Sequence, residues 1–121
     1  MIRKIIASLT VTATVCTFLA GCENPPVQVE VHLNIRSHLF EPNELHVPAN
    51  TVVRLVIHNL DSSPEEFESQ SLNREKLVLG ESTAALMIGP LMPGEYTFYG
   101  MFNPHTAIGT IIAEEAADAN D

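Results

Sequence analysis

The sequence predicts an all-β domain, an antiparallel Greek-key β-sandwich of about seven strands. Residues 27–36 alternate strictly between apolar and polar side chains, as a strand with one buried face does. Short segments rich in β-branched residues follow at close spacing, with Gly, Pro and Asn in the turns between them. The sequence shows neither a heptad repeat nor a convincing amphipathic helix. We therefore expect two sheets that enclose a single core.

The other predicted strands follow in chain order after a proline-containing bend at residues 40–43. Residues 44–47 form a short strand, and the turn at 48–50 contains Asn50, a residue type that tolerates a positive φ. Residues 51–59 are the clearest strand because β-branched side chains dominate them. Glycine and proline end several of the later strands. These strands are expected at residues 75–79, 83–88, 96–101 and 109–114.

Residues 1–21 are predicted to be a secretory signal peptide rather than part of the fold. Arg3 and Lys4 provide a positive start, and residues 5–20 form an apolar stretch that is too short to span a bilayer. The segment leads into Leu-Ala-Gly-Cys, which resembles a bacterial lipobox. That resemblance implies cleavage before Cys22 and acylation of this residue. An ordinary signal peptide with a chance cysteine is the alternative.

Acylation would anchor the mature protein on the periplasmic side of a bacterial membrane without spanning it. The mature chain would then consist of a short tether at residues 22–26, one folded domain at 27–114, and a disordered acidic tail at 115–121. The length of this chain accommodates one small domain.

The charge balance limits the possible partners. The chain has six basic and fifteen acidic residues, and the signal removes two of the basic ones, which leaves a net charge of −11. Nucleic acid is excluded as a partner because phosphate binding needs Lys and Arg; cations or a basic protein are expected instead. Cys16 lies within the signal and Cys22 would carry lipid, so the mature domain has neither a disulfide nor a thiolate ligand.

The acidic segment at residues 58–69 is the strongest functional signal. It is expected to be a turn, and it places Glu65, Glu66 and Glu68 around Phe67. Carboxylates repel one another, so the cluster is either a solvated loop or a site for a hard cation. On an extended segment Glu66 and Glu68 would project to one side while Phe67 anchors in the core.

Two segments resemble the copper-binding loops of the cupredoxin family. Residues 59–65 are similar to the cupredoxin turn that ends in Pro-His, with Glu65 in place of the His. Residues 100–109 resemble the C-terminal ligand loop, where Gly100 stands in place of the Cys and His105 is retained. A blue-copper centre requires a thiolate together with two imidazoles, so an electron carrier of the ordinary kind is disfavoured. The resemblance extends over nearly the whole mature domain.

A narrower resemblance concerns residues 64–69, together with 37–42 and 106–109. These segments are similar to the cupredoxin-like periplasmic proteins of bacterial ferrous-iron uptake systems. The resemblance implies that copper or iron binds at Glu66 and Glu68. It also implies a partner in the inner membrane, a high-affinity iron permease or another uptake component.

Four further residues are candidate ligands. The resemblance carries over His38 from an Asp-His-x-Phe-x-Pro pattern, in which this chain has Ser37 for the Asp. His105 lies in a loop and could supply a second imidazole, whereas Met101 could supply a thioether. Glu65 is an alternative or supporting ligand. The opposing explanations are a surface location for the two histidines and simple packing for the methionine.

The sequence therefore favours a lipid-anchored, periplasmic metal-binding protein that assists iron uptake. The alternative is a metal-free β-sandwich that docks to a membrane partner as an assembly module. Hydrolase motifs, including a serine triad and a phosphate loop, are not present. An accessory role in Fe(II) oxidation is compatible with the candidate ligands, but no residue pattern identifies an enzyme.

Overall fold

The computed structural model describes residue 21 and residues 28–116. Residues 1–20, 22–27 and 117–121 lie outside the described residues. They include Cys22, the whole expected tether and all of the expected signal except Gly21. The described part of the chain contains no helix long and apolar enough to cross a membrane.

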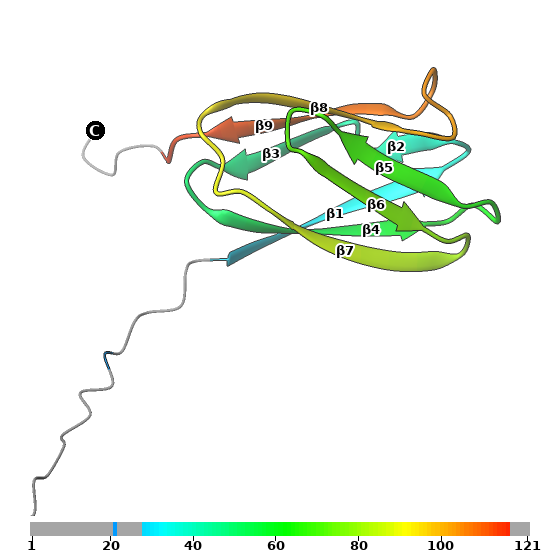
Figure 1. The fold of residues 1–121 in the computed structure, drawn as a ribbon, viewed down its shortest axis with the longest axis horizontal. Coiled ribbons are helices and arrows are strands. Elements are labelled where there is room, and N and C mark those ends of the chain that lie inside the picture. The colour runs from blue at the N-terminus through cyan, green and yellow to red at the C-terminus, as the bar shows by residue number, and fades with distance from the viewer. Residues whose placement is uncertain (1–20, 22–27, 117–121) are drawn as a thin grey trace, which may run out of the picture.

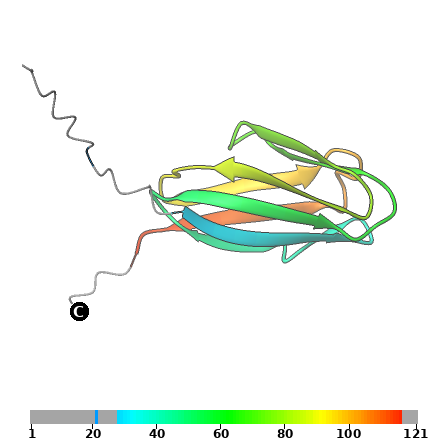
Figure 2. The ribbon, with the colours of Figure 1, turned by 90° about the horizontal axis from the view of Figure 1, so that it is seen from below.

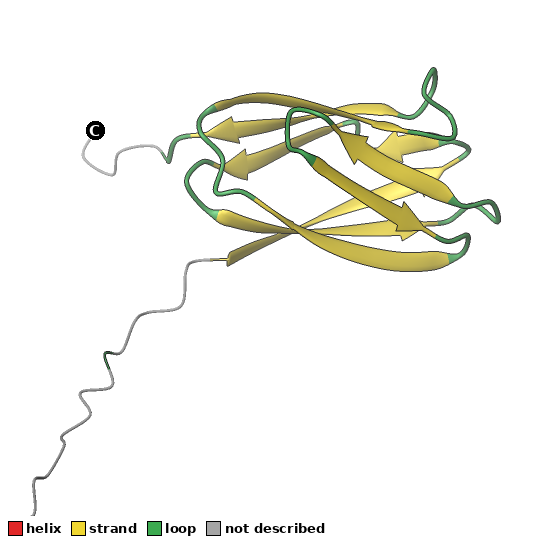
Figure 3. Cartoon of the chain, viewed as in Figure 1, coloured by secondary structure: helices red, strands yellow, loops and turns green. Residues whose placement is uncertain are grey.

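The described residues form two packed sheets (Figures 1 and 2) and contain strands but no helix (Figure 3). One sheet has the order β2-β1-β4-β7 and the other has the order β3-β9-β8-β5-β6. The strands are β1 (Gln28–Arg36), β2 (Leu39–Glu41), β3 (Glu44–Pro48), β4 (Val52–Asn59), β5 (Glu65–Ser69), β6 (Arg74–Val78), β7 (Ser82–Ile88), β8 (Gly94–Gly100) and β9 (Ile108–Glu114). The predicted all-β sandwich is confirmed.

The sequence predicts about seven strands, and the described residues form nine. Two short strands account for the difference. The first is β2, which falls where a bend was expected. Ser37 and His38 adopt positive φ angles of 52° and 58°, and this tight turn returns Leu39 antiparallel to Arg36. The second is β5, which falls within the expected acidic turn. Its side chains alternate between buried and half-buried positions, so this part of the acidic segment is a strand and not a turn.

Most pairings are antiparallel, as the sequence predicts, but β1 pairs with β4 and β3 pairs with β9 in parallel. The reason is the path of the chain between the sheets. β3 belongs to the second sheet, so the chain leaves the first sheet after β2 and returns to it only at β4. This crossover lets β4 run beside β1 in the same direction, which a hairpin cannot do.

A cluster of three phenylalanine rings occupies the core between the sheets. Phe40 lies 5.0 Å from Phe98 and 6.2 Å from Phe67 between ring centroids, and both contacts are edge-to-face. Such contacts stabilise a core beyond the effect of the buried area alone. Gly109 is required beside this cluster because a Cβ there would lie 2.2 Å from the Phe98 ring. β9 can therefore pack closely against β8.

Several connections meet at one end of the sandwich. In Figure 1 the loop after β8, the β1–β2 turn and the segment between β4 and β5 lie together, at the end opposite to where β9 finishes. We call this end the loop tip and define it by residues 37–38, 60–64 and 101–107. The asparagine at position 50 lies in a turn at the other end and has a φ of 55°, as the sequence predicts.

His46, on β3, lies between two carboxylates. Its Nδ1 is 2.9 Å from Oε1 of Glu114 on the neighbouring strand, and its Nε2 is 2.8 Å from Oε1 of Glu44. Hydrogen bonds to Glu114 and then to Glu44 raise the pKa of His46 above its ordinary value of 6.5. The protonated ring therefore links β3 to β9.

We expect the pair β3–β9 to make the stability of the domain depend on pH. Because the pKa of His46 is higher in the folded than in the unfolded state, its contribution is complete below 6.5 and is lost as the pH rises through the raised value. Urea denaturation between about pH 6 and pH 8 should show this loss. In His46→Gln the same interval should show a smaller decline. An unchanged decline in that variant would assign the dependence to other groups.

Candidate metal site and loop tip

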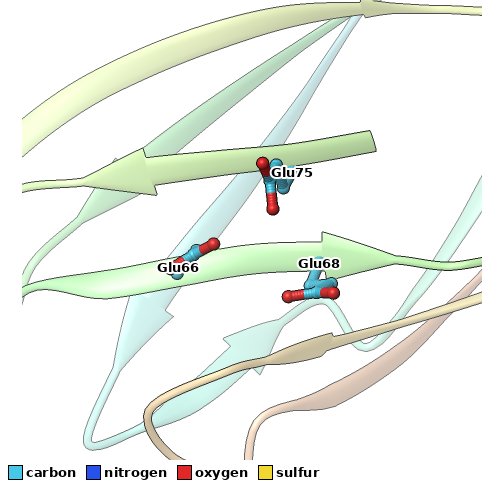
Figure 4. A group of neighbouring side chains, drawn as sticks. All are labelled: Glu66, Glu68 and Glu75. Carbon is cyan, nitrogen blue, oxygen red and sulfur yellow. The ribbon is translucent and has the colours of Figure 1, made fainter. Parts of the chain in front are cut away.

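Three carboxylates lie together on the outer face of the second sheet (Figure 4). One oxygen from each of Glu66, Glu68 and Glu75 lies within 4.8 Å of the others. Glu66 and Glu68 project from the same face of β5, whereas Phe67 between them is fully buried. This is the geometry that the sequence predicts for an extended segment. We call these three residues the acidic trio.

Glu75 was not among the residues that the sequence indicated as ligands. It lies on β6, and the antiparallel register places it directly opposite Glu68. The turn at residues 70–73 sets this register, so Glu75 approaches only once the β5–β6 hairpin has formed. The two strands are neighbours in the sequence. Pairing them as a hairpin across that turn would have placed Glu75 opposite Glu68 before the structure was known.

The acidic trio concentrates negative charge without a paired cation among residues 28–116. Arg74 is adjacent in sequence, but its guanidinium donates to the backbone carbonyls of Asn73 and Met87 instead. Like charges directly opposite each other on paired strands are unfavourable. Oxygen donors that converge in this way are suited to a hard cation, which would remove the repulsion.

Glu65 points in the opposite direction and is buried, with 2 % of its surface exposed. Its Oε1 accepts hydrogen bonds from the backbone N–H of Phe102 at 2.9 Å and of Glu66 at 3.0 Å. Its Oε2 accepts a hydrogen bond from Nδ2 of Asn103 at 2.7 Å. The carboxylate thus fixes the loop after β8 to β5. It is separate from the acidic trio, and all these interactions are structural.

Gly100 and Glu65, which the sequence resemblance matches to two cupredoxin copper ligands, are in direct contact. A Cβ at Gly100 would lie 2.6 Å from Cδ of Glu65 and 2.8 Å from the Cβ of Ala107. The carboxylate therefore fills the space into which a cysteine side chain would project. The residues at the loop tip do not fit a blue-copper centre, because the thiolate is absent and its place is occupied.

His38 and His105 lie at the loop tip and not beside the acidic trio. Thr106, which follows His105, donates a hydrogen bond from Oγ1 to the carbonyl of His38 at 3.0 Å. The two histidine positions therefore belong to neighbouring loops, and both residues are exposed. Within the described ranges, no cluster of three candidate ligands includes either imidazole.

Asp61 organises the turn that carries His38, a role that the sequence did not indicate. Its carboxylate accepts hydrogen bonds from the backbone N–H of Ser37 at 2.7 Å and of His38 at 2.9 Å. The bond from His38 is the main reason that the pKa of Asp61 lies below its ordinary value of 3.8. The turn itself, in which Ser37 and His38 adopt positive φ angles, could be recognised only from the structure.

Met101 is adjacent to the acidic trio. Its backbone N–H donates to the carbonyl of Glu66 at 2.8 Å, at the point where β8 leaves the sheet. The residue is half exposed. Met101 therefore connects the two areas: its backbone is bound beside Glu66, and the following residue, Phe102, is bound to Glu65.

Comparison with known proteins agrees with this fold. The profile of the family described as the cupredoxin-like domain matches residues 6–113. An uncharacterized protein of Rickettsia prowazekii (strain Madrid E) is 44% identical over 87 residues, which cover 72% of this chain and 70% of the relative.

Among solved structures, auracyanin A is described as a "blue" copper protein of Chloroflexus aurantiacus. It has 13% identity and a TM-score of 0.65, with 73% of this chain and 100% of that chain covered. The purple cupredoxin of Nitrosopumilus maritimus has 18% identity and a TM-score of 0.55, with coverages of 69% and 99%. A chain of a heme-copper terminal oxidase dimer has 20% identity and a TM-score of 0.64, with coverages of 90% and 80%. At these identities the likeness concerns the fold alone, a fold that is compatible with copper binding.

The contact between Gly100 and Glu65 generates a stability prediction. Gly100→Ala should lower the free energy of unfolding by about 1–3 kcal/mol, because the new methyl group must displace Glu65 or Ala107. Glu65→Ala should lower it by about 1–3 kcal/mol as well, because the loop donors lose their acceptor. Chemical denaturation measures both.

The double variant should lose less unfolding free energy than the sum of the two single losses, since either change alone disrupts the same hydrogen bonds. Strict additivity would show that the two positions do not compete for one space.

Proposed function

Because the chain belongs to the cupredoxin-like domain family, we propose that it binds an iron or copper ion at the acidic trio and assists iron uptake. The metal is cargo that the protein holds and hands on. In this proposal the protein is anchored by lipid at Cys22 on the periplasmic side of a bacterial membrane. An iron permease or another inner-membrane uptake component is the partner.

The observation that carries the proposal is the convergence of Glu66, Glu68 and Glu75 without a paired cation among the residues described. All three donors are oxygens. Of the two candidate metals, this donor set favours hard Fe(III) over soft Cu(I), which prefers thiolate and thioether ligands. The filled space at Gly100 supports the same choice, because it removes the thiolate route to copper.

The exposure of the site suits temporary binding. Glu66 and Glu68 are half-buried, and Glu75 is exposed, so solvent reaches an ion bound there. A rigid anchor, Phe67, keeps two of the carboxylates in place. Met101 lies beside Glu66 and is half exposed, so its thioether is available to contact an ion during its arrival or transfer. His38 and His105 lie apart from the trio, at the loop tip. This role requires no chemical step by the protein.

The association with iron uptake rests on the sequence resemblance at residues 64–69, which includes Glu66 and Glu68. The membrane location rests on the lipobox that ends at Cys22. An anchor at this position would leave the folded domain tethered by residues 22–26, close to a membrane protein that accepts the ion. The strongly acidic mature chain would also attract cations to this surface.

Metal titration tests the binding site. Calorimetry of the mature protein with Fe(III) nitrilotriacetate and with Cu(II) should detect binding at the acidic trio, and Glu66→Gln, Glu68→Gln or Glu75→Gln should each weaken that binding on the order of tenfold or more. Glu95→Gln is the matched control, because Glu95 is an exposed acid on β8 outside the acidic trio. Equal binding by the control and the three trio variants would refute the site.

Cell fractionation tests the anchor. The wild-type protein should remain with membranes after a high-salt wash, because acyl chains bind through apolar burial and not through charge. Cys22→Ser should appear in the soluble fraction. Cys16→Ser should stay on the membrane, since that cysteine lies within the expected signal. Membrane retention of Cys22→Ser would contradict the lipid anchor.

A metal-free docking module is the second candidate function. The observation in its favour is a group of exposed apolar side chains on or next to the loop tip, Leu39, Leu60, Phe102 and Ile108, which are 44% to 52% exposed. Large exposed apolar side chains that gather in one region are typical of interaction surfaces. Absence of stoichiometric metal in the titration above, for both ions, would favour this function over the first.

A further inference from the structure

His32 and His58 meet on the outer face of the first sheet. They lie on neighbouring strands, β1 and β4, and Nδ1 of His32 is 2.9 Å from Nε2 of His58. Leu33 and Ile35 of β1 are buried, so the alternate position of His32 faces solvent. The acidic trio lies on the outer face of the other sheet. The histidine pair is therefore separate from the site described above.

The two rings face each other edge to edge. Their centroids are 5.2 Å apart and their planes differ by 6°. Nδ1 of His32 and Nε2 of His58 are only 2.9 Å apart. The centroid separation exceeds this nitrogen separation by the sum of the distances from each centroid to its own nitrogen. The rings therefore lie nearly in one plane with the two nitrogens pointing at each other. They are not stacked face to face.

The outer nitrogen of each ring has its own partner. Nε2 of His32 is 3.0 Å from Oε1 of Glu30, whose other oxygen accepts a hydrogen bond from Arg54 at 2.8 Å. Nδ1 of His58 is 3.0 Å from Oγ1 of Thr83 on β7. Metal-binding histidines generally donate their second N–H to a carboxylate or another oxygen in this way, which fixes the ring and the tautomer.

We propose that His32 and His58 form a two-imidazole binding site for Cu(II). Two cis ligands of a tetragonal ion, each bound at about 2.0–2.1 Å, lie about 2.9 Å apart. The nitrogens already have this separation, so binding requires only that the rings tilt until their lone pairs converge. The side chain of His32 is 55% exposed, which permits that tilt.

The protons balance without an added reactant. In the neutral pair one hydrogen lies between the rings, and Thr83 donates to Nδ1 of His58. When the ion binds, the proton on Nε2 of His58 is released to solvent and Nδ1 takes one up, so His58 exchanges tautomers and Thr83 becomes the acceptor. Each ring remains neutral; His32 keeps its outer N–H, and His58 gains one at Nδ1. Water from the open surface beside the exposed His32 completes the coordination.

The experiment uses the mature protein carrying Glu66→Gln, Glu68→Gln and Glu75→Gln, so that binding at the acidic trio cannot contribute. Cu(II) is added and followed by calorimetry and by electron paramagnetic resonance. We expect one bound ion with coupling to two imidazole nitrogens. His32→Asn or His58→Asn should weaken binding about tenfold or more, and Thr83→Val should weaken it about tenfold. His46→Asn, the matched control, should bind as the parent does.

A second readout identifies the atoms. Zn(II) is diamagnetic, and nitrogen NMR of the rings should show perturbation of Nδ1 of His32 and Nε2 of His58, while Nε2 of His32 stays protonated and Nδ1 of His58 becomes protonated. Unchanged Cu(II) affinity in both histidine variants, or a Cu(II) spectrum without nitrogen coupling, would overturn the proposal. Failure of the acidic trio to bind metal would leave these expectations unchanged.

Discussion

The burial of Phe67 is the constraint on which both acidic features depend. Its ring packs among Phe40 and Phe98, and this fixes which face of β5 points inward. Because side chains alternate along a strand, Glu65 must then point into the protein, and Glu66 and Glu68 must point out. One aromatic contact thus divides a run of acids into a buried structural carboxylate and an exposed pair.

The buried carboxylate changes what the loop tip can do. Glu65 accepts three hydrogen bonds and lies against Gly100, so the tip is held by polar contacts where the family fold can hold copper. A buried carboxylate of this kind is stable only while its hydrogen bonds are satisfied. The tip is therefore a closed structural unit, and both proposed metal sites lie on the outer surfaces of the sandwich.

The two outer faces offer different donors. The face of β5 and β6 presents carboxylate oxygens, which favour hard cations, and the face of β1 and β4 presents imidazole nitrogens, which favour Cu(II) and related ions. Each set comes from neighbouring strands, so the sheet register determines the spacing between donors. The same sandwich can thus display two chemically distinct surfaces without a deep cavity.

The all-β class, the positions of the long strands and the outward direction of Glu66 and Glu68 could be predicted from the sequence, because these depend on alternation along a single segment. The sequence did not determine β2, the parallel pairings, Glu75 or the meeting of His32 with His58. Each of these depends on which strands become neighbours and in what register, and only tertiary packing decides that. The burial of Glu65 belongs to the same group, since its donors lie 37 and 38 residues further along the chain.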